Sequence, residues 1–374
     1  MTTTSSEWGT TGWRRGLRGL LLVLALILIV GAFLPLRQTD LWWVRMLDFP
    51  RLQLAGIGII VFLLYYVSEP HPGRGRSVWI LSMLGIATVW QLVHTIRYLP
   101  FWPREIASVD GCPAEQRLSL LGVNVLTPND RYQDTLDMIG RADADVVLLT
   151  ESDRMWEAAM HPIHDKYPYR LGRPLDNLYG MHLYSRLPFT GELLARVQPD
   201  IPSIKGQLTL RNGQKVTLHG LHPEPPQPGD NAGERDAELI LVGREVRDDG
   251  GAALVLGDLN DVAWSPTSRL FLEASGMNDP RVGRRLLSTF NAKWPLMRWP
   301  LDHLFASPHF SLIEMKRMEK IGSDHFPVLF HLCLTDNAEE RLVAPEAPDD
   351  TEEEASEQLR EGATEAVIER RGKN

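Results

Sequence analysis

The residues best suited to chemistry in this 374-residue chain follow a short apolar run at 254–256, in the sequence Gly-Asp-Leu-Asn at 257–260. A short apolar run preceded by two glycines fits a buried strand. Asp258 and Asn260 are one residue apart, and on extended backbone this spacing points both side chains to the same side. A carboxylate that takes up a proton or a metal ion, beside a carboxamide that donates hydrogen bonds, is suited to the hydrolysis of a phosphate ester. For this tetrapeptide alone, an Asx turn that closes a strand is the alternative.

Other polar side chains also follow apolar runs. Residues 145–150 (DVVLLT) predict a second buried strand with Glu151 at its exit, and residues 215–221 predict another strand, followed by His222. Prolines in the HPEPP segment hold His222 on rigid backbone. A lone acid at the end of a strand is usually a solvated loop residue, so each candidate depends on the others. In chain order the strand ends supply Asn124, Glu151, His222, Asp258, Asn260, Asp302, Asp324 and His325.

The elements that would position these residues are short strands interleaved with a few helices. Apolar residues at helical spacing predict helices at 132–139, 231–247 and 269–274. Further strands are predicted at 116–126 with a break at Gly122, and at 179–184, 301–305 and 327–332. This order predicts a mixed α/β sandwich of two layers, because a strictly alternating parallel sheet would need more crossovers.

Charge divides the chain into three predicted parts. Residues 1–104 carry a net charge of +6 and residues 336–374 one of −8, which leaves −7 of the total of −9 for residues 105–335. An acidic central domain is a poor candidate for gripping long nucleic acid, since that binding needs clustered cations. The Glu-rich tail from 336 is predicted to be disordered. Cys112 and Cys333 define neither a disulfide framework nor a zinc site.

Three apolar stretches within residues 1–104 predict transmembrane helices, at 19–36, 52–67 and 77–96. A helical span needs roughly 20 apolar residues. A cleaved signal peptide is the alternative for the first stretch, but no cleavage site of the A-x-A type follows it. Arg14, Arg15 and Arg18 favour a cytoplasmic N-terminus, although five Arg would then lie on each side. With three spans, the central domain would lie outside the cytoplasm.

Seven segments resemble, in order and spacing, the motifs of the endonuclease/exonuclease/phosphatase superfamily, which has the deoxyribonuclease I-like fold. They are NVLTPN at 124–129, DVVLLTE at 145–151, YSRLP at 184–188, LHPEPP at 221–226, GDLN at 257–260, LDHLF at 301–305 and GSDH at 322–325. The resemblance covers residues 115–332, and it is greatest to bacterial membrane-anchored members with a short hydrophobic N-terminal region. The chain departs from the family at 299–302 (WPLD), where Arg or Ile often precedes the Asp.

The resemblance implies a four-layer α/β/β/α sandwich, here preceded by a transmembrane helical region, that hydrolyses phosphate esters with Mg²⁺, or with Mn²⁺ in its place. Carried over by position, Glu151 would be the metal ligand, helped by Asn124 and Asp324, and oxygen ligands suit such hard cations. The implied catalytic residues are His222, Asp258, Asn260, Asp302 and His325. Asp258 would orient or deprotonate water, Asn260 would hold a phosphate oxygen, and His222 would contact the phosphate or the leaving group. His325, oriented by Asp302, would stabilise the transition state; whether His325 or Asp258 is the base stays open.

These expectations describe a membrane-anchored, metal-dependent phosphodiesterase of the bacterial inner (cytoplasmic) membrane, multi-pass, with its catalytic domain extracytoplasmic. Its substrate would be a nucleic-acid or lipid-headgroup phosphodiester, with nucleic acid as a substrate only. A catalytically silent module that binds a phosphorylated ligand or a protein is one alternative, and a membrane scaffolding protein is another. The side chains expected to line the substrate entrance, where aromatics would stack on a base or lie in lipid headgroups, are Trp264, Trp294, Arg298 and Trp299. Packing against the membrane is the alternative for them.

Overall fold

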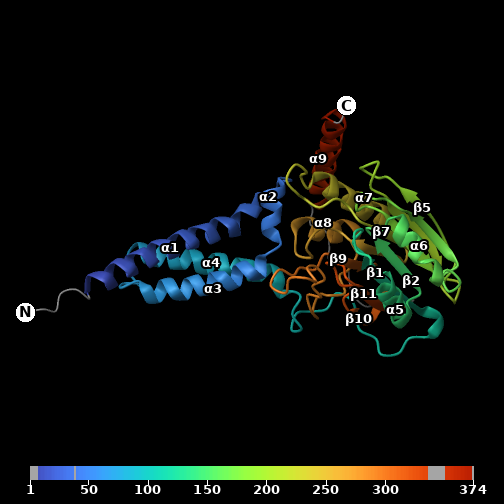
Figure 1. Ribbon diagram of the computed structural model, residues 1–374, viewed down its shortest axis with the longest axis horizontal. Helices are drawn as coiled ribbons and strands as arrows, with labels where there is room; N and C mark the ends of the chain where they lie inside the picture. Colours follow the sequence, from blue (N-terminus) through green and yellow to red (C-terminus); the bar gives the residue numbers. More distant parts are fainter. Residues whose placement is uncertain (1–6, 38, 336–349, 373–374) are drawn as a thin grey trace, which may run out of the picture. The chain divides into compact units, whose positions relative to one another are not determined.

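The computed structural model describes residues 7–37, 39–335 and 350–372, and the chain forms two compact units, Met1–Arg97 and Tyr98–Asn374. The first unit consists of helices (Figure 1). Its elements are α1 (Glu7–Phe33), η1 (Leu34–Leu36), α2 (Trp42–Arg45), η2 (Met46–Asp48), α3 (Arg51–Ser68) and α4 (Arg76–Ile96). Within the part of the chain that the structure describes, three stretches are long and apolar enough to cross a membrane, Gly12–Leu36, Arg51–Ser68 and Arg76–Ile96, which confirms the three predicted apolar helices.

The three long helices pack on one another through small and apolar residues. Leu21, Val61 and Leu84 are buried in one cluster. A Cβ atom added at Gly58 would lie 2.5 Å from Thr88 Oγ1, so glycine permits the close approach of α3 and α4. Much of the remaining apolar surface of these helices is exposed, as a lipid-facing surface would be.

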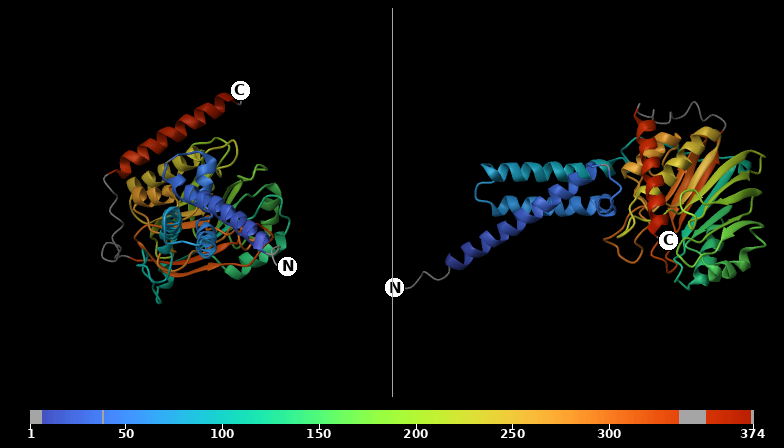
Figure 2. Two further views of the ribbon diagram at one scale, coloured as in Figure 1. Left: turned by 90° about the vertical axis from the view of Figure 1, so that its left-hand side faces the viewer. Right: turned by 90° about the horizontal axis from the view of Figure 1, so that it is seen from above.

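The second unit contains two sheets (Figures 1 and 2). The strand order is β10-β11-β1-β2-β4-β3 in one sheet and β5-β6-β7-β8-β9 in the other. The strands are β1 (Arg117–Asn124), β2 (Val146–Thr150), β3 (Tyr169–Arg173), β4 (Met181–Ser185), β5 (Phe189–Leu194), β6 (Ser203–Thr209), β7 (Lys215–Leu221), β8 (Ala253–Asp258), β9 (Asp302–Ala306), β10 (Phe310–Arg317) and β11 (Val328–Leu334). The helices are η3 (Ala114–Gln116), α5 (Tyr132–Ala142), α6 (Arg154–Ala159), η4 (His161–Ile163), α7 (Gly233–Asp249), α8 (Pro266–Ser275) and α9 (Thr351–Gly372).

Alternating side chains along the central strands build three apolar layers. Leu254 and Leu256 of β8 pack between the sheets, whereas Val255 packs against α7 and α8 on the outer face of the second sheet. On the first sheet, Leu120 of β1 faces the other sheet, and Leu121 packs in the cluster formed with α5 and α6. Period-two alternation in strands covered on both faces therefore produces an α/β/β/α sandwich, as the family resemblance implies. The prediction of only two layers is too simple, because two sheets form the middle of the molecule.

The strand β1 runs through Gly122 without the predicted break. A Cβ atom at Gly122 would lie 3.3 Å from Leu256 Cδ1 and 3.4 Å from Val328 Cγ2, so this glycine lets the two sheets pack closely. The second unit begins at Tyr98. Tyr98 is fully buried and donates a hydrogen bond to the carbonyl oxygen of Ala263, at 2.6 Å.

Two features at the ends of the central domain are not contained in the sequence predictions. Cys112 and Cys333 form a disulfide with a Cα–Cα distance of 5.9 Å, which links the segment before β1 to β11. In the acidic tail, which was predicted to be disordered, Thr351–Gly372 form α9, and the other residues from 336 to 374 lie outside the described residues. Ala355 of α9 packs on Ile240 and Leu270, and Glu352 pairs with arginines of α7, so contacts with the sandwich stabilise a helix that has little apolar content of its own.

Candidate active site

The topology brings the candidate residues to one end of the sandwich. Asn124 and Glu151 lie at the carboxyl ends of the parallel strands β1 and β2, and His222 and Asp258 lie at the carboxyl ends of the parallel strands β7 and β8. Strand β9 is antiparallel to β8, so its first residue, Asp302, pairs with Asp258. Strands that end at the same edge present their terminal side chains to one another.

The turns that carry two of these residues have unusual backbone conformations. Glu151 has φ 58° and Asn260 has φ 50°, in the left-handed region that non-glycine residues rarely occupy. Such conformations cost about 1–3 kcal/mol each and persist where the surrounding structure holds them. At Gly257 a Cβ atom would lie 1.9 Å from the carbonyl oxygen of Leu221, so glycine allows β7 and β8 to approach just before Asp258. The chain therefore uses strained backbone to aim the side chains at this edge.

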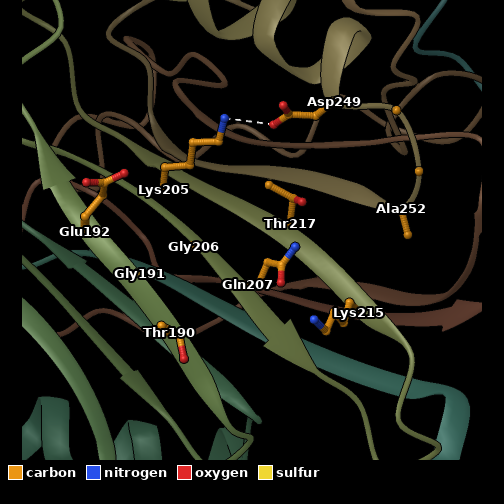
Figure 3. Close-up of a pocket in the computed structure, with 12 residues that line it drawn as sticks. Thr190, Gly191, Glu192, Lys205, Gly206, Gln207, Lys215, Thr217, Asp249 and Ala252 are labelled. Carbon is orange, nitrogen blue, oxygen red and sulfur yellow. Dashed lines mark ion pairs between the residues drawn. The ribbon is translucent and has the colours of Figure 1, made fainter.

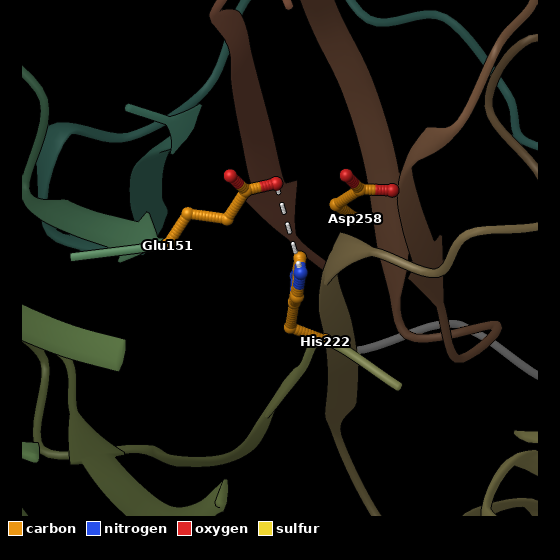
Figure 4. A group of neighbouring side chains, drawn as sticks. All are labelled: Glu151, His222 and Asp258. Atoms are coloured by element: carbon orange, nitrogen blue, oxygen red, sulfur yellow. Dashed lines mark ion pairs between the residues drawn. The ribbon is translucent and has the colours of Figure 1, made fainter. Parts of the chain in front are cut away.

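Asn124 bridges the two buried acids. Its Nδ2 donates to Glu151 Oε1 at 2.7 Å and to Asp258 Oδ2 at 2.9 Å, and its Oδ1 accepts from the backbone N–H of Leu126. His222 Nε2 lies 4.0 Å from Glu151 Oε1 (Figure 4). Among the described residues, Glu151 Oε2 and His222 Nδ1 are buried and have no hydrogen-bond partner. One ligand atom each from Glu151, His222 and Asp258 lie within 4.8 Å of one another.

A second group surrounds His325. Its Nδ1 lies 2.8 Å from Asp302 Oδ2, and its Nε2 lies 3.4 Å from Asp258 Oδ2. Burial lowers the pKa of His325, but the carboxylates of Asp258 and Asp302 outweigh burial and raise this pKa to about 10. The ring is therefore an imidazolium at neutral pH. Phe290 covers it at a centroid distance of 4.9 Å.

The acids of the first group lie where negative charge is unfavourable. Burial raises the pKa of Glu151 to about 7, against the hydrogen bond from Asn124, and the charges of Asp258 and Asp324 add to the increase. Burial also raises the pKa of Asp258 and lowers the pKa of His222 to about 4. A cation at this position would favour the ionised form of both carboxylates and so offset the effect of burial on their pKa. The unpartnered Glu151 Oε2 and the oxygen-rich donor set fit a hard divalent ion, so the residues present suit the metal that the resemblance implies.

Residues 121–325, more than half of the chain, match the model of the Endonuclease/Exonuclease/phosphatase family. The chain belongs to this family. Enzymes of the endonuclease/exonuclease/phosphatase family are typically metal-dependent hydrolases of phosphate esters, and the side chains grouped here could hold such a metal ion. No curated protein matches the chain.

Several solved structures are similar to part of the chain at low sequence identity. The endonuclease/exonuclease/phosphatase from Beutenbergia cavernae is 17% identical, with a TM-score of 0.48 over 59% of this chain and 72% of that one. TDP2 of D. rerio, complexed with a single-strand DNA product, is 18% identical, with a TM-score of 0.47 over 58% and 98%. Beta toxin from Staphylococcus aureus is 19% identical, with a TM-score of 0.44 over 57% and 99%.

The remaining candidates of this family member lie beside the two groups. Asn260 donates through Nδ2 to the carbonyl oxygen of Pro223 at 2.9 Å, so it ties the HPEPP segment to the turn that carries Asp258. The charge of Asp324 acts on both Glu151 and His325. The structure thus brings the eight candidates that were predicted from the sequence into one region. The ligand and catalytic roles assigned to them stay predictions.

A buried polar network under the 257–260 turn was missed by sequence reasoning. Arg235 of α7 donates to the carbonyl oxygen of Asn260 at 2.9 Å, and His303 Nε2 lies 2.9 Å from the carbonyl oxygen of Asp261. Arg281 Nη2 lies 2.7 Å from His303 Nδ1. Burial, and then the charge of Arg281, lowers the pKa of His303 well below its usual value, so the ring is neutral. In the sequence, Arg235, Arg281 and His303 look like solvated helix and loop residues, and no motif distinguishes them from such residues.

A different hollow lies on the outer face of the second sheet, away from these residues. Its volume is about 780 Å³, and its lining comes from β5, β6, β7 and residues 249–252 (Figure 3). Lys205 and Asp249 form an ion pair of 2.8 Å across it. None of the eight candidate side chains lines this hollow. The hollow is therefore separate from the group of candidate residues.

Proposed function

We propose that this chain is a membrane-anchored phosphodiesterase that requires a divalent cation, most simply Mg²⁺. The observation that supports the proposal is one buried group in which the carboxylates of Glu151 and Asp258 lie beside the protonated ring of His325. Acids that ionise with difficulty, next to a fixed cationic donor, are suited to binding a metal ion and a phosphate together. The group also contains a buried carboxylate oxygen, Glu151 Oε2, that has no hydrogen-bond partner among the described residues and that a bound cation would satisfy.

Glu151 would be the principal metal ligand, with Asp324 and Asn124 beside it. The bound cation would polarise the phosphoryl group and offset the charge that develops during attack. Asn124 uses its amide hydrogens on Glu151 and Asp258 and its carbonyl oxygen on the backbone of Leu126. Its main contribution in our proposal is therefore to hold the two carboxylates in a fixed orientation, and direct ligation is the lesser part.

The general base would be Asp258. Because the pKa of His325 is about 10, the ring already carries its proton at neutral pH and cannot accept another. His325 would instead donate from Nε2 to a phosphoryl oxygen, while Asp302 holds Nδ1 and so fixes the orientation of the ring. Asp258 Oδ2 lies next to that nitrogen, where it would take the proton of the attacking water. Neutral His222 would contact the phosphate or the leaving group, and Asn260 would hold a phosphate oxygen.

A diester fits this site better than a monoester. A monoester carries close to two negative charges at neutral pH and a diester carries one, as a second phosphate pKa near 6 dictates. The site holds several carboxylates within a domain whose net charge over residues 105–335 is −7, so the less charged substrate is repelled less. Both nucleic-acid and lipid-headgroup diesters meet this requirement. The three apolar helices favour a lipid substrate.

We further propose that the chain is a multi-pass protein of the bacterial inner membrane, with the catalytic unit outside the cytoplasm. The disulfide between Cys112 and Cys333 supports this orientation, because disulfides form and persist in oxidising compartments. An alkaline phosphatase fused after the last strand should be active if the unit is outside. A fusion that is inactive, although the protein is present in the membrane, would contradict the orientation.

The test of the activity uses the full-length protein in detergent with bis(4-nitrophenyl) phosphate and Mg²⁺. We expect turnover that a chelator removes and that Glu151→Gln, Asp258→Asn and His325→Ala each abolish. Glu192→Gln, the same chemical change as the first at an exposed position of β5, is the matched control and should keep full activity. Full activity in chelator would refute the proposal. A panel of DNA, RNA and phospholipids under the same conditions would then define the substrate.

A further inference from the structure

One loop of the catalytic unit exposes large apolar side chains. Trp294 is 68% exposed, Leu296 is 84% exposed and Met297 is 49% exposed, on a turn closed by a hydrogen bond from Met297 N to the carbonyl oxygen of Trp294. Elsewhere in residues 105–335, all of which the structure describes, the exposed large apolar side chains are Met155, Tyr169 and Leu178, each alone in the sequence. Clustered apolar exposure on a soluble surface marks a contact site for a partner or a membrane.

Basic side chains surround the base of this loop. Arg298, Arg317 and Lys320 lie over the ring of Phe326, at 5.0, 4.3 and 5.8 Å from its centroid. The fourth member of this basic cluster is Arg285: after burial, the charges of Arg298 and Arg285 lower the pKa of Arg317. None of the four forms an ion pair with a described residue. A concentration of unpaired cations in a domain of net negative charge attracts an anionic partner.

The guanidinium groups of the basic cluster are held in place by carbonyl oxygens. Arg298 Nε donates to the carbonyl oxygen of Asn291 at 3.0 Å, and Arg317 Nη1 donates to that of Ser288 at 2.9 Å. Carbonyl contacts fix the position of a guanidinium without neutralising its charge. The cluster therefore keeps its full positive charge for an external ligand.

The loop is also bonded to the candidate active site. Ala292 N donates to the carbonyl oxygen of Asp324 at 2.6 Å, and Phe326 N donates to that of Thr289 at 3.0 Å. Phe290 stacks on Trp299 and contacts the ring of His325 at a tilted angle. The base of the loop is therefore joined to the segment that carries His325.

A second exposed aromatic segment, Phe101 and Trp102, lies beside Gly283, two residues before Arg285 of the basic cluster. Phe101 is 71% exposed and Trp102 is 42% exposed, and a Cβ atom at Gly283 would lie 2.5 Å from the carbonyl oxygen of Trp102. The third apolar helix ends at Ile96, and Trp102 follows it after only five residues, within about 20 Å of extended chain. Tryptophan and phenylalanine beside a span are typical of the membrane–water interface.

We propose that the loop 291–298 and the basic cluster of Arg285, Arg298, Arg317 and Lys320 bind the surface of an anionic lipid bilayer. Trp294, Leu296 and Met297 would enter the interface, and the four cations would contact lipid phosphates. Single-stranded nucleic acid fits less well, since binding it relies on stacked rings, and two of the three exposed side chains here are aliphatic. If the proposed function also holds, the consequence is that the substrate is a phosphodiester of a lipid headgroup, presented at the loop.

A single reporter in the full-length protein tests this. Both native cysteines are in the disulfide, so Leu296→Cys introduces the one free thiol of the chain under oxidising conditions. An environment-sensitive fluorophore on this thiol is followed in nanodiscs that contain phosphatidylglycerol and spin-labelled lipid. We expect a blue shift and quenching by the spin-labelled lipid. Asn212→Cys, in the exposed turn between β6 and β7, carries the control label and should show neither.

The role of charge has its own pair of variants. Lys320→Glu should lower the ratio of inserted to free label by about fivefold or more, as expected for a cation near an anionic surface. Lys215→Glu, an equal change of charge at an exposed position on β7, should leave this ratio unchanged. In nanodiscs made only of phosphatidylcholine, the two variants should behave alike. Met297→Cys repeats the measurement at a second position of the tip.

Two outcomes would overturn the proposal. One is a label at 296 and at 297 that behaves like the label at 212 in anionic nanodiscs. The other is a label that responds to a single-stranded oligonucleotide and not to lipid, which would assign the basic cluster to nucleic acid. The fluorescence needs no turnover, so an inserted loop on an inactive protein contradicts only the proposed function, and an active protein with a free loop contradicts only the present proposal.

Discussion

Replacing Glu151 by Gln should stabilise the metal-free protein at alkaline pH and remove its response to Mg²⁺. The carboxyl group is poorly solvated, with its side chain 13% exposed, and its Oε2 has no hydrogen-bond partner among the described residues. Gln keeps the shape and can still accept the hydrogen bond from Asn124. The substitution therefore removes the buried charge while it changes little of the packing.

The magnitude follows from the pKa. Burial raises the pKa of Glu151 from 4.5 to about 7, which corresponds to about 3 kcal/mol. Because the folded protein holds this proton more tightly than the unfolded chain, stability is lost as the pH rises from about 4.5 to about 7, and the loss is complete above that. The variant should therefore gain nothing near pH 4.5 and about 3 kcal/mol near pH 8, or roughly 6–12 °C in melting temperature for a domain of this size.

Thermal unfolding of the full-length protein in detergent, with chelator, at about pH 5 and about pH 8, measures this gain. Mg²⁺ added at the higher pH should raise the melting temperature of the wild type and leave that of Glu151→Gln unchanged. Glu192→Gln serves as the control, and its difference from the wild type should not depend on pH. An equal response of the Glu151 variant and the wild type to Mg²⁺ would refute Glu151 as the ligand.

Three further predictions concern the Asp302–His325 pair, the pH dependence of the affinity for Mg²⁺ and the disulfide. Asp302→Asn should lower the pKa of His325 and reduce turnover by about 10²–10⁴-fold, while Mg²⁺ still raises the melting temperature. A variant that loses both turnover and stabilisation by Mg²⁺ would point to misfolding. The apparent affinity for Mg²⁺, measured by calorimetric titration, should fall about tenfold per pH unit below about 7, because protons compete for Glu151. Cys333→Ala should cost about 2–5 kcal/mol of stability, seen in thermal melts with and without reductant. If reductant does not change the melting temperature of the wild type, the predicted stabilisation by the disulfide is contradicted.

Strand ends were the most predictable part of the molecule. An apolar run that stops at a polar residue marks both a buried strand and the point where it leaves the core, which is why Glu151, His222 and Asp258 could be singled out from sequence. The central strands β2, β7 and β8 were predicted for the same reason, since they are covered on both faces.

The peripheral strands were not predictable in this way. β3, β5 and β10 lie at sheet edges and carry exposed residues, and β5 has no fully buried position. Their formation depends on pairing with a neighbour, which no local pattern of apolar residues records. The disulfide was equally hidden, because its two cysteines are 221 residues apart and meet only once β11 pairs with β1.

The buried charges below the site had no local signal for a different reason. Arg235 lies between two acids in an amphipathic helix, and such a charged residue is usually expected on the solvent-exposed face. In the structure it is 1% exposed and donates a hydrogen bond to the backbone of Asn260. A polar group is buried when partners from distant segments satisfy it. Such partners, including the Arg281–His303 pair, are defined only by the folded chain.

The electrostatics of the site connect its cost in stability with its proposed chemistry. Glu151, Asp258, Asp302 and Asp324 act on one another around a single imidazolium, so His325 neutralises only part of their charge. Burial, with a smaller contribution from Asp258 and Asp324, raises the pKa of Glu151, and the charges of Asp258 and Asp302 raise the pKa of His325. With a cation bound, Glu151 would be ionised, and Asp302, which bonds to Nδ1, would help to keep the proton on His325. The metal-bound site would then contain an ionised Asp258 able to accept a proton and a charged His325 able to donate a hydrogen bond, the combination that attack of water on a phosphodiester requires.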